Sequence, residues 1–235
     1  MTKRNAMQNF FKQLTKPKVA TNLNMEIKES PPIPKPTIAD WLFRKSVPLV
    51  VSAEDRELVG TYIKPDLQHG PWIAGGAVLR WYQNKPVCDH DVDVFVKNDE
   101  QFEQVKNNII NKLHGATLFN SDNATTYKVY INRDTPYKIQ LIKHYCDSLK
   151  DCLDRFDFTV CKISTDGVSW VKGQNFDRDF ESKSLVIEGG LRPDSIKRVV
   201  KYICYGYEPS TDLLDELYND DNLKLAFSDD EDYRM

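Results

Sequence analysis

Two aspartates carry the most specific chemical pattern in this sequence. Asp91 and Asp93 alternate with apolar residues through Val96, so a β-strand would place both carboxylates on one face. Their Cβ atoms would lie ~6–7 Å apart, close enough to share divalent metal ions through hard oxygen ligands. An acidic face on an otherwise apolar strand needs a reason, and metal binding supplies one. The pattern predicts a metal site suited to phosphoryl or nucleotidyl transfer.

A pair of glycines precedes the acidic strand. Gly75 and Gly76 follow the apolar run 71–74, and residues 77–82 have helical spacing. A turn without Cβ atoms lets a phosphate approach backbone amides at the start of a helix. Arg80, one turn further along, could face the phosphates. An apolar strand, Gly-Gly, a helix with arginine and an acid–x–acid strand form a more specific pattern together than separately.

These motifs resemble those of a known superfamily. The segments WIAGGAVLRW and DHDVDVFV are similar to the signature of DNA polymerase β-type nucleotidyltransferases, especially the head domain of CCA-adding enzymes and bacterial poly(A) polymerases. They also look similar to nucleotidyltransferases encoded by phages and large DNA viruses. Asp157-Phe158-Thr159-Val160 resembles a later strand of those enzymes. The resemblance covers roughly residues 71–163, under half of the chain.

The resemblance implies roles for individual residues. It makes Gly75 and Gly76 the triphosphate-binding turn, and it makes Asp91 and Asp93 the catalytic ligands of Mg²⁺ or Mn²⁺. Arg80 stands in the place of the arginine of the head helix. Asp157 corresponds to a later aspartate, predicted to complete or support the catalytic site.

The resemblance also implies an activity. The chain would move a nucleoside monophosphate from an NTP such as ATP to an acceptor and release pyrophosphate. The resemblance to CCA-adding enzymes favours an RNA 3′ end as the acceptor, and a protein or a small molecule stays open.

Two departures from the superfamily pattern leave alternatives. Asp89-His90-Asp91 is a second possible acid–x–acid motif, although Val92 and Val94 make Asp91/Asp93 the better strand. Many superfamily members carry a third carboxylate on a neighbouring strand, where this chain presents Gln140. A catalytically weak or inactive fold that serves as a scaffold, in a viral assembly for example, is therefore the second hypothesis.

Two further cations are candidates for nucleotide binding. Lys138 lies in a predicted strand that would adjoin the acids, and Arg198 lies in a predicted amphipathic helix, 193–205, with Lys197 and Lys201. Arg198 or Lys201 would contact a phosphate or an RNA backbone. An ordinary helix with a basic solvent face is the alternative.

The remaining pattern predicts an α+β domain over residues 37–207, in which helices flank a small mixed sheet. The predicted helices include 99–113, 148–153 and 193–205, and the predicted strands include 71–74, 91–96, 126–132, 137–143 and 156–163. Residues 1–36 are predicted to be a flexible basic arm with a proline-rich linker, and residues 208–235 an acidic tail. Either end could bind a protein partner.

Composition narrows the class of protein. Hydrophobic residues make up 40% and charged residues 29% of the 235 residues, as expected for a globular chain, and the net charge of −3 gives no overall basic field. The five cysteines contain no CxxC pair, which disfavours a zinc site and favours reduced thiols. No run approaches the ~20 apolar residues of a membrane span. The sequence predicts a protein of the cytoplasm, or of a host cytoplasm or virion if viral.

Overall fold

The computed structural model describes residues 55, 57–85, 87, 91–131, 136–192 and 195–219. All of these belong to one structural unit, Leu49–Met235. The predicted basic arm, the alternative metal ligand Asp89 and the end of the acidic tail lie outside the described residues.

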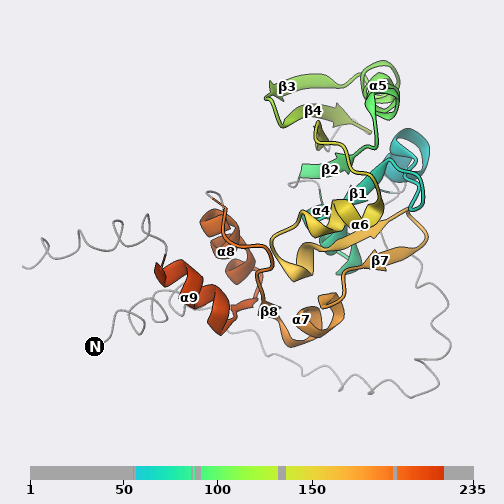
Figure 1. Cartoon of the computed structure of the whole chain (residues 1–235). Helices are drawn as coiled ribbons and strands as arrows, with labels where there is room; N and C mark the ends of the chain where they lie inside the picture. The colour runs from blue at the N-terminus through green and yellow to red at the C-terminus, as the bar shows by residue number, and fades with distance from the viewer. Residues whose placement is uncertain are drawn as a thin grey trace, which may run out of the picture. The chain divides into compact units, whose positions relative to one another are not determined.

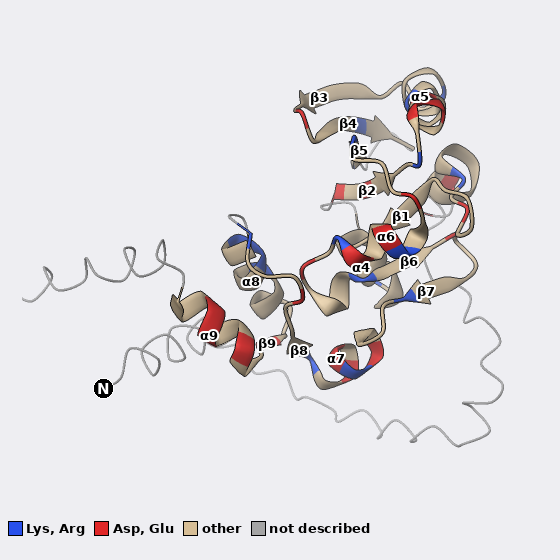
Figure 2. Cartoon of the chain, in the orientation of Figure 1, with Lys and Arg blue, Asp and Glu red and all other residues tan. Residues whose placement is uncertain are grey.

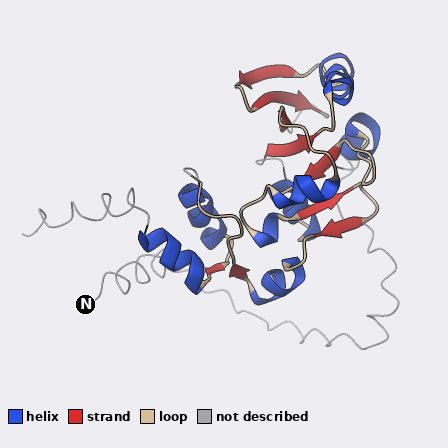
Figure 3. Cartoon of the chain, in the orientation of Figure 1, coloured by secondary structure: helices blue, strands red, loops and turns tan. Residues whose placement is uncertain are grey.

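A seven-stranded mixed sheet forms the centre of the described fold (Figures 1 and 3). Its strands run in the spatial order β3-β4-β5-β2-β1-β6-β7, in which only β2 and β5 pair in parallel. In chain order the strands are β1 (Trp72–Ala74), β2 (Asp91–Phe95), β3 (Ala116–Asn120), β4 (Ala124–Tyr130), β5 (Pro136–Ile142), β6 (Ile163–Thr165) and β7 (Trp170–Lys172). The predicted α+β class with a mixed sheet is confirmed.

The two faces of β2 have opposite chemistry, because side chains alternate along a strand. Val92 and Val94 are fully buried on one face, together with Ile139 and Leu141 of β5. Asp91, Asp93 and Phe95 lie on the other face. Apolar burial on one side therefore fixes the register that turns both carboxylates to the same side.

Helices are interspersed with these strands along the described part of the chain. They are η1 (Leu58–Ile63), α4 (Gly76–Tyr82), α5 (Asp99–Asn107), η2 (Asn108–Lys112), α6 (Leu149–Asp154), η3 (Thr159–Cys161), α7 (Phe176–Ser182), α8 (Ser195–Cys204) and α9 (Thr211–Asn219). Side-chain caps start two of the predicted helices, since Asn98 accepts from Gln101 N–H at α5 and Ser148 accepts from Asp151 N–H at α6. None of the described helices is long and apolar enough to cross a membrane.

Helix α6 covers one end of the acidic face. Its Leu149 and Leu153 pack in one apolar cluster with Trp72, Ala74 and Phe95 of the sheet. On the opposite side of Asp93, the same face carries the polar residues Asp91 and Lys138. Asp93 therefore lies where the apolar cluster gives way to polar side chains.

The predicted strand 156–163 is wrong. Cys161 N–H donates to the Phe158 carbonyl and Lys162 N–H to the Thr159 carbonyl, which makes the 3₁₀ turn η3, and the strand β6 begins only at Ile163. The Asp157 carboxylate accepts the Phe158 N–H and so supports the turn.

Residues 208–219, which were predicted to belong to the acidic tail, take part in the fold. Glu208–Pro209 form β9, which pairs in parallel with β8 (Ser184–Leu185). Helix α9 buries Leu213 and Leu217. Its acids occupy the solvent side of an amphipathic helix.

Candidate functional site

The acid pair lies on the same face of the sheet as α6, beyond the apolar cluster that α6 covers. Asp93 pairs with Ala74 of β1 on one side and with Gln140 of β5 on the other. Asp91, one pleat earlier, pairs with Lys138 and is exposed. The structure thus brings the predicted residues Asp91, Asp93 and Lys138 onto one face of adjacent strands.

Asp93 is held in an environment that disfavours its charge. Its Oδ1 atom is buried and has no hydrogen-bond partner among the described residues. Burial, followed by the negative charge of Asp91, raises the pKa of Asp93 to about 7. The positive charges of Lys201 and Arg198 oppose that shift. A buried carboxylate oxygen needs a partner, and a raised pKa shows that the nearby positive charges do not offset burial and the charge of Asp91. A bound cation would supply both the partner and the missing positive charge.

The glycine turn leads directly away from the strand that pairs with Asp93. Gly75 has φ +89°, and a Cβ at this position would lie 2.5 Å from the Phe156 ring, so only glycine fits. The Gly75 N–H donates to the Ile163 carbonyl at 3.0 Å. Gly76 begins α4, and a Cβ there would lie 3.4 Å from the Tyr202 hydroxyl. Gly75 is therefore required by the backbone conformation of the turn, whereas Gly76 lies next to Tyr202 of α8.

Arg80 lies on α4, one turn beyond Gly76. Its guanidinium lies over the Tyr205 ring, 5.6 Å from the centroid. This contact packs α4 against the C-terminal end of α8. The predicted contact of Arg80 with phosphate stays a prediction.

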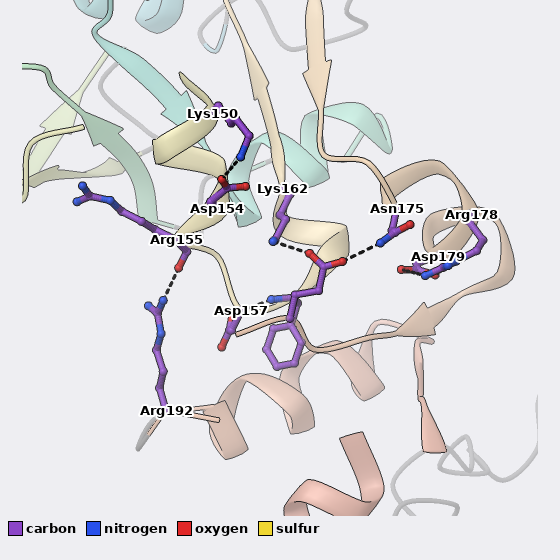
Figure 4. Close-up of polar contacts among 11 residues, drawn as sticks. Lys150, Asp154, Arg155, Asp157, Lys162, Asn175, Arg178, Asp179 and Arg192 are labelled. Atoms are coloured by element: carbon purple, nitrogen blue, oxygen red, sulfur yellow. Dashed lines mark hydrogen bonds and ion pairs between the residues drawn. The ribbon is translucent and has the colours of Figure 1, made fainter. Parts of the chain in front are cut away.

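Asp157 occupies a different setting from the acid pair. It is 1% exposed, and its Oδ2 accepts the Ser195 hydroxyl at 3.0 Å and forms an ion pair with Arg198 at 2.6 Å. Its Oδ1 accepts the Phe158 N–H. Both oxygens are thus engaged by donors of the protein (Figure 4 shows Asp157 on its loop above α8). Asp157 therefore fixes α8 to the loop that precedes β6. Its predicted catalytic role stays a prediction, and in this geometry it would consist of positioning Arg198.

Helix α8 brings two cations toward the acids. Figure 2 shows Lys and Arg along α8, whereas α9 carries acids. Arg198 is oriented by Asp157, and Lys201 is exposed in the next turn. Because both lower the pKa of Asp93, their charges reach the acid pair. The charge of Lys201, which was predicted with Arg198 to contact a phosphate or an RNA backbone, thus acts on the acid pair, and the phosphate contact itself stays a prediction.

No third carboxylate joins the pair within the described ranges. Gln140 lies beside Asp93, at the position where the sequence pattern suggested a missing acid. The described residues contain no cluster of three or more His, Cys, Asp or Glu side chains that could hold a metal ion. The oxygen set of Asp91 and Asp93 still fits Mg²⁺, since this ion binds through one or two carboxylates and completes its shell with substrate phosphates and water.

A separate cavity of about 380 Å³ lies between α6 and the β6–β7 edge. Its charged walls are already paired, since Lys162 binds Glu188 at 2.6 Å and Lys172 binds Asp177 at 2.7 Å. Asn175 also donates to Glu188 (Figure 4). The cavity contains none of the predicted site residues, so the acidic face of the sheet remains the candidate site.

A mixed sheet, a Gly-Gly turn into a helix and an acid–x–acid strand define the nucleotidyltransferase fold, and solved structures agree. The chain resembles a CCA-adding enzyme in complex with CTP (TM-score 0.50, 17% identity, 66% of this chain and 40% of that chain covered). A complex with ATP gives a TM-score of 0.50 at 16% identity, with the same coverage. The Thermotoga maritima CCA-adding enzyme bound to tRNA gives 0.46 at 17% identity, covering 61% of this chain and 36% of that one. The chain thus spans under half the length of these enzymes.

Residues 51–183, more than half of the 235-residue chain, match the Gad2 family, described as Gabija anti-defense 2 family protein. The chain belongs to this family. No curated protein sequence matches it. The matched range contains the glycine turn, the acid pair and β5, whereas α8 lies beyond it.

Proposed function

We propose that this chain is a metal-dependent nucleotidyltransferase that opposes the Gabija defence system by attaching a nucleoside monophosphate to an acceptor. The observation that carries the proposal is the environment of Asp93. A carboxylate oxygen without a donor, beside a second carboxylate and next to the glycine turn, suits a divalent cation better than any structural role. Mg²⁺ held by Asp91 and Asp93 would neutralise charge on the triphosphate and polarise the acceptor hydroxyl.

The described residues divide the remaining work. Gly76, at the start of α4, would offer backbone N–H to the triphosphate, and Lys201 and Arg198 place positive charge near the acids. Asp157 and Ser195 fix the position of Arg198. In the reaction the acceptor oxygen bonds to the α-phosphorus, the bond to the β-phosphate oxygen breaks, pyrophosphate leaves, and the hydroxyl proton passes to solvent.

An RNA 3′ end is the acceptor that we propose. Its ribose offers a hydroxyl of the kind that nucleotidyl transfer uses, and CCA-adding enzymes of similar fold were solved with CTP and with ATP. An RNA on which the Gabija response depends would then be altered or blocked. A protein acceptor, such as a component of the defence system, is the competing target of the same chemistry.

A second function is a scaffold that binds a Gabija component without catalysis. Gln140 in place of a third acid favours it, because the metal site then has two carboxylates only. The two functions differ in their need for Asp91 and Asp93. An enzyme requires both carboxylates, whereas a scaffold retains its activity when they become amides.

The test uses bacteria that carry Gabija and are infected with a phage that the system restricts. The wild-type chain, Asp91→Asn/Asp93→Asn and the surface control Lys97→Gln/Lys112→Gln are produced at equal levels, measured by immunoblot. The proposal predicts that wild type and control restore phage growth and the acid variant does not. Restoration by the acid variant at the wild-type level would contradict catalysis and support the scaffold.

A further inference from the structure

Three strands extend the sheet beyond the acid pair, on the side away from β1. The pairing carries one face of the sheet from β2 through β5 and β4 to the edge strand β3. Residues paired across neighbouring strands share a face. Side chains of β3–β5 that are in register with Asp91 and Asp93 therefore lie on the acidic face.

Two cross-strand rows define this extension. The first runs from Asp91 to Lys138, Lys128 and Ala116, and the second from Asp93 to Gln140, Thr126 and Phe119. Tyr130 follows Lys128 two residues later on β4, on the same face. Strands are spaced ~4.8 Å apart, so each row reaches ~15 Å from the acids.

Exposed aromatic and basic groups occupy these rows. Phe119 is 63% exposed and Tyr130 47% exposed, and Lys138 is exposed on the strand between them and the acids. The Lys128 ammonium lies 5.1 Å from the centre of the Tyr130 ring. Exposed aromatic rings on a sheet face offer flat surfaces on which unpaired bases can stack.

The charged side chains that β3, β4 and β5 place on this face are all positive. Its residues on β3, β4 and β5 are Ala116, Phe119, Ala124, Thr126, Lys128, Tyr130, Pro136, Lys138, Gln140 and Ile142, with no acid among them. Neither lysine forms an ion pair with a carboxylate of the described residues. The positive charge is available to a polyanion, in a chain whose net charge is −3.

We propose that Phe119, Lys128, Tyr130 and Lys138, here termed the β3–β5 platform, bind single-stranded RNA and direct its 3′ end to Asp91 and Asp93. The platform rests on the proposed function, for which it supplies the acceptor site. Exposed rings stack on unpaired bases, and lysines contact the phosphates between them. Because both rows end at the carboxylates of Asp91 and Asp93, an RNA strand bound along them would have its 3′ end at the acid pair.

Alternating rings and lysines favour RNA over a protein partner. An apolar docking face would lack the two lysines beside the acids, and an acidic protein would gain little from two exposed rings. Figure 1 shows β3 and β4 at the far end of the sheet from β7, and every residue of β3 is exposed. The edge is thus open to an extended strand of nucleic acid.

Binding to a 5′-fluorescein-labelled, unstructured 12-nucleotide RNA, followed by fluorescence anisotropy without NTP, tests the platform. Phe119→Ala/Tyr130→Ala should raise Kd at least tenfold. Lys128→Gln/Lys138→Gln should raise Kd at low salt and reduce the slope of log Kd against log salt by about 1.4. The matched controls Tyr218→Ala and Lys97→Gln/Lys112→Gln remove an exposed ring and two exposed lysines elsewhere, and they should stay within twofold of wild type.

The outcomes separate the platform from the catalytic proposal. Asp91→Asn/Asp93→Asn should retain RNA binding at least as tight as that of wild type, because it removes negative charge beside the RNA, and it should abolish transfer. RNA binding lost in the platform variants but not in the controls supports the platform, even if no transfer is found. Unchanged RNA binding in both platform variants overturns it. Absence of RNA binding by wild type, with nucleotide attached to a protein instead, overturns it as well and leaves transfer intact.

Discussion

The metal-free chain should become less stable as pH rises toward 7, because Asp93 then loses its proton, and Asp93→Asn should abolish this dependence on pH. Burial next to Asp91 raises the pKa of Asp93 from 3.8 to about 7. The folded state therefore holds a proton that the unfolded state has released across this interval. The stabilisation is fully present below the unfolded pKa and is lost as pH rises through 7, so the free energy of unfolding falls toward alkaline pH.

The size of the effect follows from the shift. At 1.36 kcal/mol per pKa unit, the linkage removes about 2 kcal/mol from the free energy of unfolding between pH 5.5 and 8.5. Asparagine has the shape of the neutral acid but does not ionise. The difference in unfolding free energy between wild type and Asp93→Asn should therefore change by about 2 kcal/mol over this range, with the variant favoured at high pH.

Urea unfolding followed by tryptophan fluorescence, in EDTA and at half-unit pH steps, measures this difference. Asp91→Asn is the matched variant, because it removes the neighbouring charge and should shift the pH midpoint downward. Mg²⁺ added at pH 8.5 should stabilise wild type and leave Asp93→Asn unchanged. Parallel curves for wild type and Asp93→Asn from pH 5.5 to 8.5 would refute a buried, electrostatically strained Asp93.

Three further substitutions test the surrounding geometry. Gly75→Ala should lower the free energy of unfolding by about 2–3 kcal/mol in urea titrations, because it combines a positive φ with a ring clash, whereas the control Gly76→Ala should cost under about 1 kcal/mol. Asp157→Asn should lower the free energy of unfolding by about 3 kcal/mol because it breaks a buried ion pair, and Ser195→Ala should lower it by about 1 kcal/mol. Mn²⁺ affinity that is unchanged in both variants, measured by electron paramagnetic resonance, would confirm a positioning role for Asp157. Gln140→Glu should tighten Mn²⁺ about tenfold at pH 8.5 by supplying a third carboxylate, and weaker binding would contradict its placement beside the acids.

Local periodicity predicted the centre of the fold well. Alternation of acids and valines located β2, and the Gly-Gly pair located the turn into α4, because both patterns follow directly from backbone geometry. The long amphipathic run 99–113 became α5 and η2. These elements carry the acid pair, so the core of the candidate site was predictable.

Features that depend on distant contacts were not predictable. Asp157 looked like part of an apolar strand, but its pairing with Ser195 and Arg198 depends on a helix some 40 residues later in the chain. β3 was missed because every residue in it is exposed, which gives no apolar alternation. The platform required the register of β3, β4 and β5, in which one bulge decides that Phe119 shares a face with Asp93.

The most direct test of the central claim is transfer itself. Purified chain is incubated with each α-³²P-labelled NTP, Mg²⁺, pooled RNA from Gabija-carrying cells and the purified Gabija proteins, in parallel with Asp91→Asn/Asp93→Asn. We predict label at RNA 3′ ends with one preferred NTP, with wild type only and only with Mg²⁺. Label on a Gabija protein would keep the transferase and replace its acceptor. No label in RNA or protein with any NTP would contradict the account.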